Sequence, residues 1–88
     1  MYTLDSAPAA DRDMRTLARR APRSDYEAIE AAINDLAEDP RSPGTTKLAG
    51  SEDAYRIRVR RYRIIYAVDD QEQRVILLRV LPRAQAYR

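Results

Sequence analysis

Cysteine, histidine, tryptophan and phenylalanine are all missing from this 88-residue chain, and lysine occurs once, at Lys47. Without cysteine the chain can form neither a disulfide framework nor a thiolate metal site. Without histidine it lacks the commonest metal ligand and the usual general acid–base group. We therefore expect no metal and no other cofactor. Any catalysis must use carboxylates, arginine, tyrosine, serine or Lys47.

Long apolar runs are also missing. No run approaches the roughly 20 residues that cross a bilayer, and residues 1–5 lack the basic flank and apolar stretch of a signal peptide. These absences predict a cytoplasmic location and no membrane partner. The length leaves room for one core, so we expect a single domain over residues 1–88.

The net charge of +2 hides an uneven distribution along the chain. Residues 1–44 contain six arginines against nine acids, whereas residues 45–88 contain ten basic residues against five acids. Residues 54–68 hold five arginines and no acid. Such a cluster attracts polyanions, although a solvated basic strand is an equally simple interpretation.

The first half of the chain predicts a short strand followed by two helices. Residues 2–4 form the strand, and apolar residues at helical spacing predict a helix from Pro8 to about Arg19. Ser24 and Glu27 have the spacing of a capping box, so the second helix is expected to start at Ser24. Pro40 ends it, and residues 40–46 are expected to be a connector.

The second half predicts three strands, at residues 55–60, 62–68 and 74–81. In the first of these, apolar residues alternate with arginines, which indicates one apolar face and one basic face. The acids at 69–72 are interpreted as turn chemistry and not as a metal site. The result is an α+β fold of order β-α-α-β-β-β, in which two N-terminal helices cover one face of a mostly antiparallel sheet.

Arg56 and Arg58 are two residues apart on one strand, so their side chains leave the sheet on the same side, roughly 6–7 Å apart. Arg63 on the next strand is placed to join them, and Arg83 and Tyr87 follow the last strand. An arginine can donate two hydrogen bonds to one phosphate, and a tyrosine beside it can stack on a base. The sequence therefore predicts an RNA-phosphate site on the uncovered sheet face. Three other tyrosines are better explained as packing residues, namely Tyr55, Tyr62 and Tyr66.

Several stretches of the second half resemble one known family. They are Lys47-Leu-Ala-Gly, Tyr55-Arg-Ile-Arg-Val, Tyr62-Arg-Ile-Ile-Tyr and the Arg83 to Tyr87 ending. Together they resemble the RelE branch of the RelE/ParE toxin superfamily. The resemblance implies the toxin of a type II toxin–antitoxin pair, restrained by a RelB-like antitoxin. It implies a metal-free endoribonuclease that cuts mRNA in the ribosomal A site, with the ribose 2′-hydroxyl as nucleophile. It leaves open whether the toxin–antitoxin complex binds operator DNA.

The resemblance also assigns roles to individual residues. Arg56 and Arg58 match two basic strand positions, Arg63 the contact to the scissile phosphate, Arg83 a phosphate stabiliser or proton donor, and Tyr87 the base-stacking residue. Further candidate RNA contacts, which an ordinary solvated turn explains more simply, are Lys47, Arg60 and Arg61.

Arginine at both strand positions leaves no evident general base, because arginine is a poor proton acceptor at neutral pH. A second function therefore stays open, that of a ParE-like toxin which binds and inhibits DNA gyrase and cuts nothing.

Overall fold

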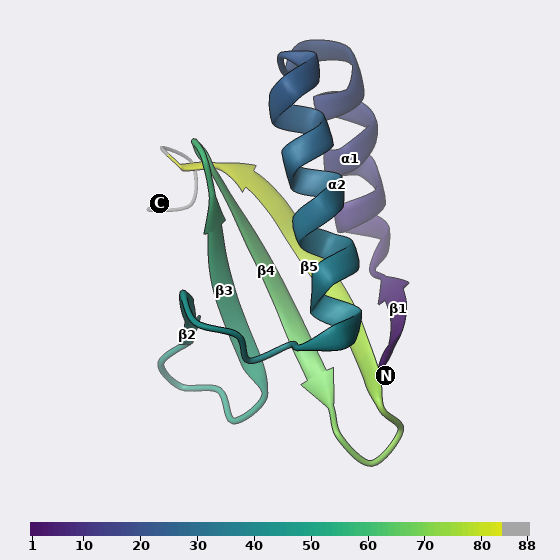
Figure 1. Ribbon diagram of the computed structural model, residues 1–88, viewed down its shortest axis with the longest axis vertical. Coiled ribbons are helices and arrows are strands. Elements are labelled where there is room, and N and C mark those ends of the chain that lie inside the picture. The colour runs from purple at the N-terminus through teal and green to yellow at the C-terminus, as the bar shows by residue number, and fades with distance from the viewer. Residues whose placement is uncertain (84–88) are drawn as a thin grey trace.

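A computed structural model describes residues 1–83, in which two helices lie together on one face of a five-stranded sheet (Figure 1). The strand order is β1-β5-β4-β3-β2, and only the β1–β5 pair is parallel. The α+β fold predicted from the sequence is confirmed. In chain order the elements are β1 (Thr3–Ser6), α1 (Pro8–Arg20), α2 (Arg23–Glu38), β2 (Thr45–Lys47), β3 (Ala54–Val59), β4 (Tyr62–Asp69) and β5 (Arg74–Pro82).

The core lies between the helices and the covered face of the sheet. Helix α2 contributes Ile29, Ile33 and Leu36, which recur at helical spacing and are buried. The central strand β4 contributes alternate residues, because successive side chains of a strand point to opposite faces. They are Tyr62, Ile64, Tyr66 and Val68, all of them buried. Within residues 1–83, no helix has the length and apolar character to span a membrane.

A bulge in β5 explains why its buried residues do not alternate strictly. Ile65 of β4 pairs with Arg79, whereas the next residue, Tyr66, pairs with Leu77, so β5 carries one extra residue, Leu78. A bulge of this kind changes which face the following residues occupy. Both Leu77 and Val80 are buried as a result, although they are three residues apart.

Two local predictions from the sequence were wrong. Helix α2 begins at Arg23 with Pro22 as its N-cap, and no side chain caps it. The Pro22 carbonyl already accepts the first helical bond, from the Tyr26 N–H at 3.0 Å, so Ser24 lies inside the first turn where it cannot cap. The connector at 40–46 also contains the start of β2, which pairs with β3 at the sheet edge.

The exposed edge of β5 is closed by a side chain instead of a strand. Strand β1 pairs with β5 only as far as Leu77. Beyond that point the Val80 N–H donates to Asp13 Oδ2 of α1 at 2.9 Å, and Asp13 also binds the Arg79 guanidinium at 2.8 Å. Unpaired strand edges invite association with other chains, and a carboxylate here removes one such donor. Asp13 thereby joins α1 to the end of β5 that leads to Arg83.

Candidate functional site

The arginine residues of β3 and β4 meet on the uncovered face of the sheet. In the β3–β4 pairing, Tyr55, Ile57 and Val59 face the helices, and the residues between them face away. Arg58 lies directly opposite Arg63, and Arg56 lies opposite Ile65. Directly opposed residues have Cβ atoms about 5 Å apart, and diagonal ones about 7–8 Å. We call Arg56, Arg58, Arg63 and Arg83 the open-face cluster.

Arg63 is the buried member of the open-face cluster, with 1% of its surface exposed. Arg58 and Arg83 are exposed, and Arg56 is half-buried. The sequence predicted a direct contact of Arg63 with a phosphate. The structure buries Arg63 and leaves the other three members of the cluster more exposed, and the phosphate contact of Arg63 stays a prediction.

Electrostatics shows that the four arginines act on one another. The pKa of the Arg63 guanidinium is lowered, first by burial and then by three neighbouring positive charges. Those charges belong to Arg56, Arg58 and Arg83. Like charges held together raise the local positive potential, which a polyanion can relieve. The cluster is therefore suited to binding an anion with several negative oxygens.

Two members of this cluster have no acidic partner among the described residues. Neither Arg56 nor Arg83 forms an ion pair with any residue from 1 to 83. Five arginines elsewhere in the described residues do have acidic partners: Arg23, Arg41, Arg60, Arg74 and Arg79. The structure thus leaves two guanidiniums of the cluster open to a ligand.

The hairpin between β3 and β4 positions Arg83. Arg60 occupies the left-handed region at φ 54°, and its guanidinium binds Asp25 of α2 at 3.0 Å. The neighbouring Arg61 accepts a hydrogen bond at its carbonyl from the Arg83 N–H, at 2.6 Å. This main-chain bond places Arg83 beside the start of β4. Of the two predicted RNA contacts in this turn, Arg60 is engaged with an acid and Arg61 has an exposed side chain.

The two remaining candidates are Lys47 and Tyr87. Lys47 is exposed at the end of β2 and pairs with Tyr55 of β3. Tyr87, the predicted base-stacking residue, lies outside the described residues.

A polar network that sequence reasoning missed supports β3 from the covered side. The Tyr66 hydroxyl donates to the Pro40 carbonyl at 2.5 Å, and the Tyr66 ring stacks on Tyr55 with centroids 5.9 Å apart. Arg41 donates to the Tyr55 hydroxyl at 3.0 Å and forms two hydrogen bonds with Asp70, at 3.1 and 2.9 Å. These contacts hold the connector, β2 and the β4–β5 turn in fixed relation to β3. The three core tyrosines are packing residues, as the sequence predicted.

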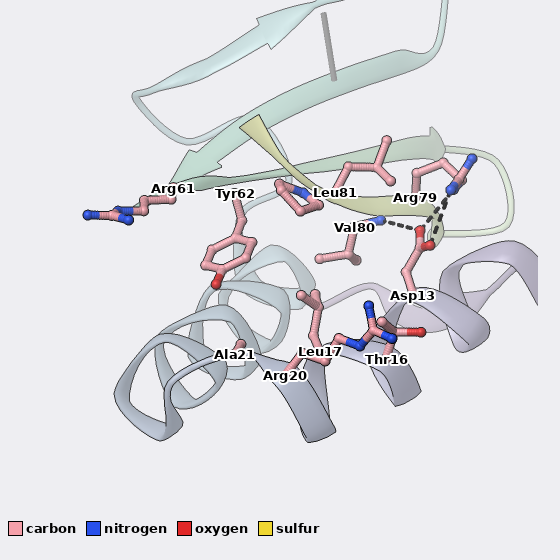
Figure 2. Close-up of a pocket in the computed structure, with 11 residues that line it drawn as sticks. Asp13, Thr16, Leu17, Arg20, Ala21, Arg61, Tyr62, Arg79, Val80 and Leu81 are labelled. Carbon is pink, nitrogen blue, oxygen red and sulfur yellow. Dashed lines mark hydrogen bonds and ion pairs between the residues drawn. The ribbon is translucent and has the colours of Figure 1, made fainter. Parts of the chain in front are cut away.

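A hollow of about 330 Å³ lies between α1 and the ends of β4 and β5. Figure 2 shows Leu17 of α1 and Val80 of β5 on its walls, with Tyr62 at one end and the Asp13–Arg79 contact at the other. Burial is the main reason why the pKa of Tyr62 is raised. Asp13, the acidic residue that lines this hollow, is already bound to Arg79, so its carboxylate is not available as a proton acceptor. We assign the hollow no chemistry.

Comparisons with known proteins agree with the fold. A family model described as the ParE toxin of the type II toxin–antitoxin system, parDE, matches residues 4–87. Toxin RelG of Mycobacterium tuberculosis (strain ATCC 25618 / H37Rv) is 36% identical over an alignment 90 positions long, which covers 99% of this chain and 97% of RelG.

Solved structures give the same result. A RelBE toxin–antitoxin complex from M. tuberculosis matches with a TM-score of 0.74 and 30% identity, over 93% of this chain and 98% of that chain. The isolated E. coli RelE toxin matches with a TM-score of 0.77 and 27% identity, over 93% of this chain and 84% of that chain. The similar proteins therefore carry both the ParE and the RelE names.

Proposed function

The chain belongs to the RelE/ParE superfamily of type II toxins, and we propose that it is a ribosome-dependent mRNA endoribonuclease. The observation that carries this proposal is the open-face cluster, in which Arg56, Arg58 and Arg83 surround a buried Arg63. A group of guanidiniums held close together suits a phosphate that gains charge during reaction. The relatives named RelE and RelG support the same choice.

In the proposed reaction the ribose 2′-oxygen attacks the adjacent phosphorus. A bond forms between the 2′-oxygen and phosphorus, and the bond from phosphorus to the 5′-oxygen of the next nucleotide breaks. The products are a 2′,3′-cyclic phosphate and a 5′-hydroxyl, so the 2′-hydroxyl proton is lost and the 5′-oxygen gains one. Guanidiniums act here by holding the phosphate in line and by stabilising the charge of the pentavalent transition state.

Individual roles follow from exposure. Arg58 and Arg83 are exposed and make the direct phosphate contacts, and the half-buried Arg56 extends them along β3. Arg63 lies beneath them and adds positive potential from below. Arginine is a poor base, so no residue of this cluster is assigned the removal of the 2′-hydroxyl proton. Tyr87 keeps its proposed role in stacking on the substrate base from the family resemblance alone.

A second candidate function is supported by a separate observation. The family model that matches residues 4–87 is that of the ParE toxin. On this alternative the chain binds and inhibits DNA gyrase, and the cluster contacts that target without cutting nucleic acid. The two functions predict different products, namely a shortened mRNA in one case and inhibited supercoiling in the other.

Primer extension on mRNA translated in the presence of the protein tests the proposal. Wild-type protein is expected to produce new 5′ ends that depend on ribosomes. Arg83→Ala should reduce cleavage about 100-fold, the usual effect of removing one transition-state donor. The main-chain bond that places residue 83 uses the N–H and survives this change.

Arg23→Ala is the matched control, because it also removes one positive charge and its side chain is 90% exposed on α2. Cleavage by this variant should equal that of the wild type. Intact mRNA together with blocked gyrase supercoiling would overturn the nuclease proposal in favour of the ParE-like one.

The proposed partner is an antitoxin with an acidic segment that covers the open-face cluster. Structures of RelE with RelB support an antitoxin as partner, and the positive cluster supplies the charge that an acidic chain would match. Co-expression of the cognate antitoxin should restore growth, and the purified antitoxin should displace RNA from the cluster. Operator DNA binding by such a complex is part of the same proposal.

A further inference from the structure

A second group of arginines lies on the opposite side of the molecule from the open-face cluster. Helix α1 carries Arg12, Arg15 and Arg19, and all three are exposed. At 100° per residue their side chains fall within about 60° of one another, along roughly 10 Å of helix. We call these three residues the α1 row. The buried residues of α1, Ala10 and Leu17, lie on the other side of the helix, against the core.

The α1 row has no acidic partner among residues 1–83, whereas Arg23 of α2 pairs with Glu27. None of its members forms an ion pair within residues 1–83. Asp11 is four residues before Arg15, the spacing of a helical ion pair, yet its carboxylate accepts from the Ser6 hydroxyl. Asp13 is bound to Arg79. The two acids of α1 are therefore used for tertiary contacts, and the row keeps its charge.

Helix stability does not account for the whole row. Cations in the last turn of a helix interact favourably with its macrodipole, which explains Arg19. Arg12 and Arg15 lie before that turn and gain nothing from it. The neighbouring helix α2 is acidic on its exposed side, where it presents Glu27, Glu30 and Glu38. The one arginine of α2, Arg23, is paired with Glu27, so the helical arginines without an acidic partner among residues 1–83 lie on α1.

We propose that the α1 row binds the phosphate backbone of double-helical RNA while the open-face cluster holds a separate single strand. The choice of RNA over DNA rests on the proposed function, whereas the inference that the α1 row binds a phosphate backbone rests on the structure alone. Helices and open face lie on opposite sides of the sheet (Figure 1), and the molecule measures 36 × 26 × 25 Å. A protein with basic surfaces on both sides can bind two RNA segments at once. Here the open-face cluster would bind the substrate strand, and the α1 row would bind a folded RNA beside it.

The chemistry of the surface favours a nucleic acid over a protein partner. Protein interfaces have an apolar or aromatic core. Around the α1 row the exposed residues are polar or small, such as Thr16 and Ala18, and Met1 is the only exposed large apolar residue within residues 1–83. A phosphate backbone needs only cations. A DNA duplex carries one phosphate per strand for about every 3.4 Å of axis and an A-form RNA duplex slightly more, so a row of roughly 10 Å faces at least about three phosphates of one strand.

The experiment measures binding of the full-length protein to a 20-base-pair RNA duplex over a range of salt concentrations. Arg15→Gln together with Arg19→Gln keeps good helix formers and removes two charges. The slope of log K against log salt should fall by about 1.5, whereas binding of a single-stranded RNA 12-mer should not change. The control is Arg23→Gln with Arg74→Gln, which removes the same net charge from residues that are already paired with acids.

The control variant should bind the duplex as the wild type does. An equal loss of slope in both variants would show that only net charge matters, and this would overturn the proposal. So would tighter binding of a DNA duplex than of the RNA duplex, or no duplex binding at low salt. Circular dichroism checks folding, and Arg12→Gln with Arg19→Gln is a second test if the first pair unfolds. Failure of mRNA cleavage with intact duplex binding would reject the proposed function and leave this inference standing.

Discussion

Tyr66 connects the core to the segment that carries β2, and its hydroxyl can be removed with little change of shape. The ring has 0% of its surface exposed, and its hydroxyl donates to the carbonyl of Pro40, which is also buried. Tyr66→Phe keeps the ring and its stacking on Tyr55. Only the link to the connector is lost, and β2 beyond the connector is the edge strand that flanks Arg56.

The expected cost follows from the carbonyl that remains. A buried polar group that loses its partner destabilises a protein by about 1–3 kcal/mol, so Tyr66→Phe should lower the free energy of unfolding by about 2 kcal/mol. For a chain of this size that corresponds to a fall in Tm of about 8–16 °C. Amide exchange in β2 should also become faster, because the connector is no longer held against Tyr66.

Urea denaturation followed by circular dichroism measures this change. Tyr55→Phe is the control: the Tyr55 hydroxyl accepts a hydrogen bond from Arg41 at 3.0 Å in an exposed setting, and its loss should cost at most about 0.5 kcal/mol. A Tyr66→Phe variant within 0.5 kcal/mol of the wild type, about the size of a neutral surface change, would refute the reasoning. It would mean that the connector is held by other contacts.

Alkaline pH gives an independent test of the same hydroxyl. Burial raises the pKa of Tyr66 to about 12, above its ordinary value of 10.0. Because the folded-state pKa is the higher one, the stability that Tyr66 contributes is present below pH 10 and is lost as the pH rises toward about 12. Tyr66→Phe should lack this part of the alkaline loss. Identical slopes of stability against pH above pH 10 in the two proteins would contradict the assignment.

Two further substitutions test contacts that hold the site in place. Hydrogen bonds from Arg41, and then from Tyr2, lower the pKa of Asp70. The stability that ionised Asp70 contributes is therefore present above its ordinary pKa of 3.8 and is lost as the pH falls below that value. Asp70→Asn should flatten the fall of stability at acid pH, and an unchanged fall would argue against this contact. Asp13→Ala removes the acceptor of the Val80 N–H, a bond to a charged group worth about 2 kcal/mol; urea denaturation should show this loss, and the uncovered β5 edge should promote association in sedimentation experiments.

Most of the architecture could be predicted because the apolar residues repeat at clear periods. Ile29, Ile33 and Leu36 mark one helical side, and the alternation from Tyr55 to Val59 marks a strand. The bulge at Leu78 could not be predicted, since it depends on which residues of β4 and β5 pair. The three-residue strand β2 could not either, because its hydrogen bonds come from β3, far along the chain.

The sequence predicted which residues form the cluster better than it predicted how deeply each one is buried. Spacing placed Arg56 and Arg58 on one face, and the predicted order of strands brought Arg63 and Arg83 near them; the structure has all four together. The burial of Arg63 gave no signal in the sequence, because arginine is one of the residues least often buried. Arg63 lies on the central strand β4, which is paired on both sides by β3 and β5.

The α1 row was missed for a different reason. Net charge over residues 1–44 is negative, since the acids of α2 outweigh the arginines of α1. Averaging over half of the chain removed the difference between the two helices. The fold shows that the acids of α1 are turned toward Ser6 and Arg79, which the sequence could not reveal. Charge patterns therefore predict a binding surface best when they are counted over one face of one helix or strand, where the side chains share one environment, and not over half of the chain.

The positions of the acids decide which arginines serve the fold and which remain for a ligand. Asp13 and Asp25 have only 13% and 15% of their side chains exposed, and each binds an arginine that links a helix to the sheet. A carboxylate that is already largely buried needs its partner, so Arg79 and Arg60 are committed to structure. Carboxylates are numerous enough to neutralise most arginines of this chain, yet within residues 1–83 Arg56 and the α1 row have no acidic partner. The placement of the acids therefore concentrates positive charge on two opposite faces of the molecule. A small change in net charge would leave these two basic faces intact.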